Sequence, residues 1–170
     1  MRPLIVLISL AFVSPISADC LQGWVEIPEE NTCILMSKMD LAHLQALRNC
    51  QTLGASLVKI GDAFMNTAIA IEAMTFENGR KTLIGIEKMS SGEWAYSDGT
   101  QLQYSKWKSG EPKANASCAA IDPTTAFWET VDCGVKMPYV CGKQDKNAPC
   151  DLGWSYSEES NACYWLKASP

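Results

Sequence analysis

The sequence predicts an α+β domain that is held together by disulfide bonds. Eight cysteines are spread over 170 residues, and no two of them are separated by only two residues. An even number of cysteines without Cys-x-x-Cys pairs is typical of a disulfide framework in an oxidising compartment, and not of a zinc site or a redox pair. Two stretches with helical spacing of apolar residues lie among several short β-prone stretches, so both kinds of secondary structure are expected.

The first residues have the order of a signal peptide. Arg2 is followed by an apolar run from Leu4 to Val13, and small residues then lead to Ala18. This order predicts cleavage after Ala18, removal of residues 1–18, and secretion to the extracellular space. The run is too short to cross a bilayer, and no later stretch is long and apolar enough, so we expect no membrane span.

The first elements of the mature chain are expected to be a hairpin and a helix. Residues 20–36 contain two β-prone stretches around a polar turn, stapled by Cys20 and Cys33. The helix is predicted to begin at Asp40 and to end at Gly54. Its buried side would carry a stripe of residues spaced by three: Leu41, Leu44, Leu47 and Cys50.

A second helix is expected after a short strand at residues 56–60. Asp62 can cap this helix, which would run through about Met74. Its inward side is predicted to carry Phe64, Ala68 and Ile71.

The remaining chain predicts strands on either side of a long loop region. A central strand is expected at residues 81–86, and three short strands at residues 118–121, 127–131 and 137–141. Between them, residues 88–117 are punctuated by Gly, Pro and Ser around aromatic residues. A loop of this length in a compact domain is usually functional or disordered, and the buried-type aromatic residues argue against disorder here. We expect Trp94, Tyr104 and Trp107 of the loop, with Trp128 of a following strand, to pack the core of the loop rather than to stack on a sugar.

Several motifs in a fixed order resemble the long form of the C-type lectin-like domain, and the resemblance covers residues 20–142. They are Leu83-Ile84-Gly85-Ile86, Glu93-Trp94, Ser97-Asp98-Gly99, Trp107 with Gly110-Glu111-Pro112, and Phe127-Trp128 with Cys133. The resemblance implies two helices flanking small antiparallel sheets, with a long loop region. It also implies three disulfide pairs: Cys20–Cys33, Cys50–Cys141 and Cys118–Cys133.

The resemblance implies a ligand site in the long loop region. Sugar-binding members hold one calcium ion there through acidic and amide oxygens, and two sugar hydroxyls complete its shell. Where such members have Glu-Pro-Asn, this chain has Glu111-Pro112-Lys113, and a later acidic position is Ala116. The Asn-Asp pair that follows the tryptophan is replaced by Glu129-Thr130.

These replacements remove most of the oxygen ligands, and calcium needs six to eight of them. We therefore expect no metal and no other cofactor, with calcium as the disfavoured alternative. The ammonium group of Lys113 is expected to form a salt bridge with Glu111 or Glu129.

The sequence thus predicts a secreted recognition module that is not an enzyme. Its ligand would be a glycan, bound at a degenerate site by Trp107, Glu111, Lys113, Glu129 and Thr130. The alternative is a protein or other non-sugar ligand, bound by the same surface without calcium. A net charge of −5 makes nucleic acid and anionic membrane poor partners. The sequence assigns no oligomeric state.

Catalysis is not expected, because the chain has a single histidine, His43. This residue is predicted on the solvent side of the first helix, with no nucleophile near it.

The loop also carries a glycosylation motif, Asn115-Ala116-Ser117. A glycan at Asn115 would crowd the predicted ligand surface.

The C-terminal residues repeat the start of the domain. The domain is expected at residues 19–142, and a polar linker at residues 143–149. Beyond the linker, the spacing of the first motif recurs at an offset of 130 residues: Cys20, Gly23-Trp24 and Cys33 correspond to Cys150, Gly153-Trp154 and Cys163. Residues 150–170 are interpreted as the truncated start of a second domain, with Cys150 and Cys163 as a local pair. They could be a remnant of a tandem-domain protein or a hairpin that docks on another surface.

Overall fold

The computed structural model describes residues 20–144, 154–157 and 162–165 of the chain. The predicted signal peptide and most of the predicted linker lie outside the described residues. The elements are, in order, β1 (Val25–Ile27), η1 (Pro28–Glu30), β2 (Thr32–Met36), α1 (His43–Thr52), β3 (Ser56–Leu57), α2 (Ala63–Phe76), β4 (Thr82–Lys88), β5 (Trp94–Tyr96), β6 (Cys118–Asp122), β7 (Phe127–Val131), β8 (Val140–Gln144), β9 (Trp154–Ser157) and β10 (Ala162–Trp165).

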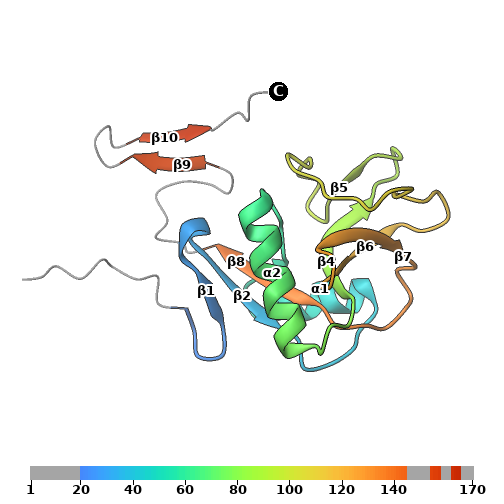
Figure 1. The fold of residues 1–170 in the computed structure, drawn as a ribbon, viewed down its shortest axis with the longest axis horizontal. Coiled ribbons are helices and arrows are strands. Elements are labelled where there is room, and N and C mark those ends of the chain that lie inside the picture. The colour runs from blue at the N-terminus through green and yellow to red at the C-terminus, as the bar shows by residue number, and fades with distance from the viewer. Residues whose placement is uncertain (1–19, 145–153, 158–161, 166–170) are drawn as a thin grey trace, which may run out of the picture.

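Two four-stranded antiparallel sheets form the domain (Figure 1). The first has the order β1-β2-β8-β3, and it joins the beginning of the domain to its end because Thr32 pairs with Gln144 and Met36 with Val140. The second has the order β5-β4-β6-β7 and carries the long loop region at its side. The predicted α+β class, with two helices and small antiparallel sheets, is confirmed.

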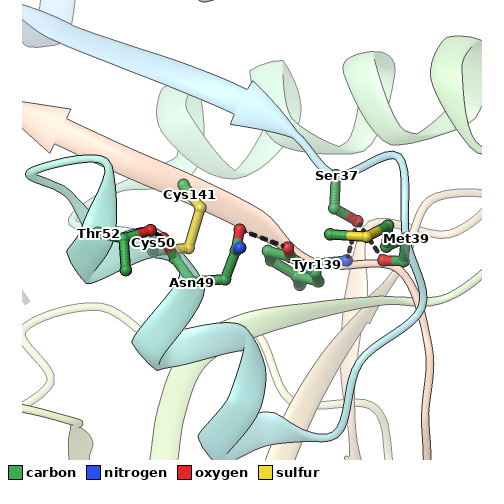
Figure 2. Close-up of a disulfide and its surroundings, with 7 residues drawn as sticks. All are labelled: Ser37, Met39, Asn49, Cys50, Thr52, Tyr139 and Cys141. Atoms are coloured by element: carbon green, nitrogen blue, oxygen red, sulfur yellow. Dashed lines mark hydrogen bonds between the residues drawn. A yellow bond between two sulfur atoms is a disulfide. The ribbon is translucent and has the colours of Figure 1, made fainter.

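Three disulfides have the pairing that the resemblance implied: Cys20–Cys33, Cys50–Cys141 and Cys118–Cys133. Figure 2 shows how Cys50–Cys141 fastens α1 to β8. Beside it, the hydroxyl of Tyr139 donates to Oδ1 of Asn49 at 2.8 Å, and the Tyr139 backbone N–H donates to Oγ of Ser37 at 3.0 Å. The predicted pair Cys150–Cys163 lies outside the described side chains.

Helix α1 is shorter and rotated relative to its prediction. It begins at His43, not at Asp40, and Asp40 forms an ion pair with Arg80 instead. Its buried residues are His43, Ala46 and Cys50. Of the predicted stripe, Cys50 is buried and Leu41 and Leu47 pack partly buried against the core, whereas Leu44 is 56% exposed. The Cys50–Cys141 bond fixes which side of the helix faces the sheet, and the small Ala46 allows a close approach there.

Helix α2 begins after Asp62 as predicted, since the Asp62 carboxylate accepts from the Met65 N–H at 2.8 Å. Of the predicted inward side, only Ala68 packs against the core, and the prediction is wrong for the other two residues. Phe64 is 49% exposed and Ile71 is 59% exposed. The helix is apolar on nearly every side, so periodicity could not select a face. The buried residues are Met65, Asn66, Ile69, Ala70 and Ala73.

The two sheets approach one another closely where β4 passes β3. A Cβ atom on Gly85 would lie 2.6 Å from the carbonyl oxygen of Leu57, so a side chain cannot fit there without movement. The N–H of Gly85 donates to the carbonyl of Val58 at 2.9 Å. This contact explains why the central strand contains a glycine between isoleucines.

The predicted strands are largely present, with shifted ends. The central strand runs from Thr82 to Lys88, and the last strand of the domain starts at Val140 and continues to Gln144, into the predicted linker. The region predicted as loop contains one short strand, β5, which pairs with β4.

Candidate functional site

The predicted ligand surface is built where the long loop lies along the outer strand β7. Trp107 forms a bridge with Trp128, and the N–H of Lys108 donates to the Trp128 carbonyl at 3.0 Å. The Trp128 N–H in turn donates to the carbonyl of Lys106 at 2.7 Å. These contacts hold the loop beside β7.

The loop aromatics pack against one another, as predicted. The ring of Trp107 lies edge-on to Trp94 at 4.9 Å and to Trp128 at 5.7 Å between centroids. Tyr104 also packs edge-on against Trp128, which is fully buried. Trp107 therefore supports the site from within the loop core.

Asn66 of α2 holds the buried tryptophan in place, and the sequence analysis did not identify it. Its Oδ1 accepts from Nε1 of Trp128 at 2.7 Å, and its Nδ2 donates to the carbonyl of Ala126 at 2.9 Å. Asn66 is fully buried. A buried tryptophan N–H needs a hydrogen-bond acceptor. The tryptophan in the sequence was therefore the only feature that could have indicated a polar partner such as Asn66.

Glu111 is the best-satisfied carboxylate of the site. Its Oε2 accepts from the backbone N–H groups of Lys113 and Thr130, each at 3.1 Å, and from the Thr130 hydroxyl. Its Oε1 lies 3.2 Å from Nζ of Lys113, which confirms the predicted salt bridge. Burial raises the pKa of Glu111, but the hydrogen bonds from Thr130 and Lys113 outweigh it and lower the pKa below its ordinary value.

Glu129 is paired with two lysines that the sequence analysis did not place in the site. Its Oε1 lies 2.6 Å from Nζ of Lys108, and its Oε2 accepts from Nζ of Lys81. Hydrogen bonds from Lys108 and Lys81 lower the pKa of Glu129. Lys81 lies 48 residues away in the chain, so no local pattern could have indicated this contact.

These residues do not fit a calcium ion. A carboxylate offers about four lone-pair positions, and four donors already point at Glu111. Both oxygens of Glu129 face ammonium groups. Calcium needs six to eight oxygen ligands, and the cations at these carboxylates are lysine side chains.

The glycosylation motif and a disulfide cysteine lie at the end of the loop region. Asn115 is exposed. The Cys118–Cys133 bridge closes the loop region at the start of β6. Of the predicted site residues, Glu111, Lys113 and Thr130 are in direct contact. Glu129 precedes Thr130 on β7.

His43 is buried, and the prediction of a surface histidine is wrong. Its Nδ1 lies 3.8 Å from the Glu87 carboxylate, and its Nε2 has no hydrogen-bond partner in the described structure. Burial lowers the pKa of His43, while Glu87 opposes that shift. His43, Glu87 and Cys118 lie within metal-binding distance of one another, but the sulfur of Cys118 belongs to a disulfide and offers no thiolate.

Comparison with known proteins places this geometry in a family. The profile described as "Lectin C-type domain" matches residues 41–143. Rheacalcin-2 of Rhea americana is 30% identical over 137 residues, covering 72% of this chain and 94% of that protein. Lymphocyte antigen 75 of Mesocricetus auratus is 28% identical over 167 residues, covering 88% of this chain.

A solved structure shows the same fold. The C-type carbohydrate-recognition domain of cow CD23, determined in the presence of an oligosaccharide, has a TM-score of 0.65 and 24% identity, and the match covers 74% of this chain and 95% of that chain. The chain spans only about 9% of the length of Lymphocyte antigen 75. Within the described residues, no helix is both long and apolar enough to pass through a bilayer.

Proposed function

Because this chain belongs to the C-type lectin domain family, we propose that it is a secreted, non-enzymatic recognition module that binds a glycan without calcium. The ligand surface is the loop Trp107–Lys113 together with Glu129 and Thr130 of β7. The observation that carries the proposal is the neutralisation of both site carboxylates by lysine ammonium groups, at 3.2 Å for Lys113 and 2.6 Å for Lys108.

Secretion is supported by the sequence and by the disulfides. Residues 1–18 have the order of a signal peptide. Three disulfides of the described domain require an oxidising compartment to form and persist.

A glycan array with the secreted full chain, in calcium and in EDTA, tests the calcium-independent binding. We expect the same glycans to bind in both buffers. Binding that disappears in EDTA would overturn the proposal, because the ion would then supply the contact that we assign to the protein.

A pair of threonine variants tests the location of the site. Thr130→Val removes the hydroxyl that donates to Glu111 and should weaken binding. Thr100→Val is the matched control, since the Thr100 hydroxyl also takes part in a side-chain hydrogen bond, which it accepts from Lys59 at 3.1 Å, outside the proposed surface. Equal effects of the two variants would contradict the assignment.

A protein or other non-sugar ligand is the second candidate for the same surface. It is favoured by the contacts of Glu111, because its Oε2 already accepts from Thr130 and Lys113 and its Oε1 faces an ammonium group, which leaves few acceptor positions for sugar hydroxyls. An array without any bound glycan, combined with ligand capture that Thr130→Val abolishes, would select this candidate.

Asn115 is proposed to carry an N-linked glycan at the edge of this surface. The residue is exposed and starts an Asn-Ala-Ser motif. If mass spectrometry finds Asn115 without a glycan in all of the secreted protein, this proposal is wrong.

The C-terminal hairpin is proposed to be the start of a second domain of the same family. Strands β9 and β10 pair Tyr156 with Cys163, which is the pairing of Glu26 with Cys33 in β1 and β2 displaced by 130 residues. The match to Lymphocyte antigen 75 covers 88% of this chain. Residues 1–144 are a smaller share of the chain than that, so the match includes residues beyond Gln144. Both facts support a repeated domain.

A further inference from the structure

We infer that the ligand of this site is an anionic glycan, whose sulfate or carboxylate group is bound by Lys81, Lys108 and Lys113. This inference rests on the proposed function and names the chemistry of its ligand. It follows from which groups of the site are covered and which are exposed.

The carboxylates of the site are buried beneath the ammonium groups. The Glu111 side chain is 5% exposed and that of Glu129 is 13% exposed. The lysine side chains are 45% exposed for Lys81, 53% for Lys108 and 64% for Lys113. A ligand that approaches this surface therefore meets ammonium groups first.

The hydrogen-bonding capacity that remains is almost entirely donating. Each ammonium has three N–H donors, and each of these lysines uses its ammonium on one carboxylate oxygen within the described contacts. Oε2 of Glu111 already accepts from Thr130 and Lys113, and its Oε1 faces the Lys113 ammonium. A sulfate or carboxylate accepts hydrogen bonds and donates none, so it matches this surface better than a neutral hydroxyl.

The charge balance of the surface is positive although the whole chain is acidic. Lys81 and Lys108 share one carboxylate, Glu129, and Lys113 pairs with Glu111. Glu129 is the main cause of the raised pKa of Lys108, and Asp122 and Glu111 are smaller causes. Three lysines thus pair with two carboxylates, so these ion pairs carry one net positive charge.

The test measures binding of the full secreted chain to defined oligosaccharides in EDTA at physiological salt. A sulfated heparin-derived hexasaccharide, its desulfated counterpart, a carboxylate-only hyaluronan oligosaccharide and a neutral mannan oligosaccharide are compared. We expect the sulfated or the carboxylate probe to bind at least tenfold more tightly than the neutral one, and the stronger of the two identifies the group. A DNA oligonucleotide of equal charge that binds as tightly would overturn the inference, because it would show charge attraction without sugar recognition.

Lysine variants locate the contact. Lys113→Gln and Lys108→Gln should each weaken binding of the acidic probe by roughly threefold, as expected for an exposed ion pair, and the double variant by about tenfold. Lys59→Gln is the matched control, because Lys59 also pairs with a carboxylate, Asp98 at 2.6 Å, outside this cluster. Thermal unfolding of each variant verifies that it folds.

Glu129→Gln gives the opposite test. It removes the charge that Lys81 and Lys108 neutralise, so it should strengthen binding of the acidic probe. Unchanged or weaker binding in this variant, with a native unfolding temperature, would contradict the inference. EDTA-resistant binding of neutral glycans without preference for acidic ones would refute the anionic ligand and leave the proposed function standing.

Discussion

Replacing Asn66 by alanine should destabilise the domain through the strand that carries the ligand site. Asn66 lies on α2, and its side chain makes two buried hydrogen bonds, to Nε1 of Trp128 at 2.7 Å and to the carbonyl of Ala126 at 2.9 Å. In Asn66→Ala the Trp128 N–H is fully buried without an acceptor, which costs about 1–3 kcal/mol. The second lost bond brings the expected loss of unfolding free energy to roughly 2–4 kcal/mol.

The loss can be measured by urea denaturation followed by far-UV circular dichroism, with the disulfides intact. Thr67→Ala is the control, because Thr67 lies on the exposed side of the same helix and its hydroxyl donates to a backbone carbonyl of that helix, at Ala63. This control should change the unfolding free energy by no more than about 0.5 kcal/mol. A change of similar size in Asn66→Ala would refute the reasoning, since it would mean that water satisfies the Trp128 N–H.

A double-mutant cycle separates the hydrogen bond from packing. Trp128→Phe removes the donor and leaves Oδ1 of Asn66 without a partner. If the bond is energetically important, the combined variant of Asn66→Ala and Trp128→Phe should lose less than the sum of the single losses, by about 1 kcal/mol or more. Additive losses would show that the two residues contribute independently.

Two further predictions concern stability. Burial lowers the pKa of His43 in the folded chain, so the unfolded chain binds the proton more tightly. The stability contribution of neutral His43 should therefore be complete above pH 6.5 and should be lost as the pH falls from 6.5 toward the lower pKa of the folded state. His43→Gln should flatten this fall in urea midpoints between pH 7.5 and pH 5, and an unchanged pH profile would contradict the assignment. Gly85→Ala should lose about 1–3 kcal/mol because its Cβ would meet a carbonyl oxygen at 2.6 Å, whereas Gly61→Ala, with nothing within 4 Å, should cost little. Equal urea midpoints for the two glycine variants would show that the sheets can move apart without cost.

Local chemistry accounts for what the sequence predicted well. The hairpin around residues 28–31, the Asp62 cap and the central strand each depend on residues that are neighbours in the chain. The resemblance then selected the disulfide pairing, including Cys50–Cys141, which joins residues 91 positions apart.

Helix faces were predicted poorly because they depend on tertiary contacts. On α1, the disulfide at Cys50 and the small Ala46 fix the buried side, so Leu41 and Leu47 pack only at its margin and Leu44 is exposed. On α2, the polar Asn66 faces inward because the buried Trp128 needs its oxygen.

The sequence alone determined that this chain has a disulfide-stapled α+β domain, and it predicted a loop in which Lys113 replaces an oxygen ligand. These conclusions need only residue types and short spacings, which local geometry preserves. Only the tertiary structure decided that Lys81 and Lys108 neutralise Glu129, and that the carboxylates lie beneath an ammonium surface. Charge pairing in folded proteins depends on distance in space, and Lys81 is separated from Glu129 by 48 residues in the chain.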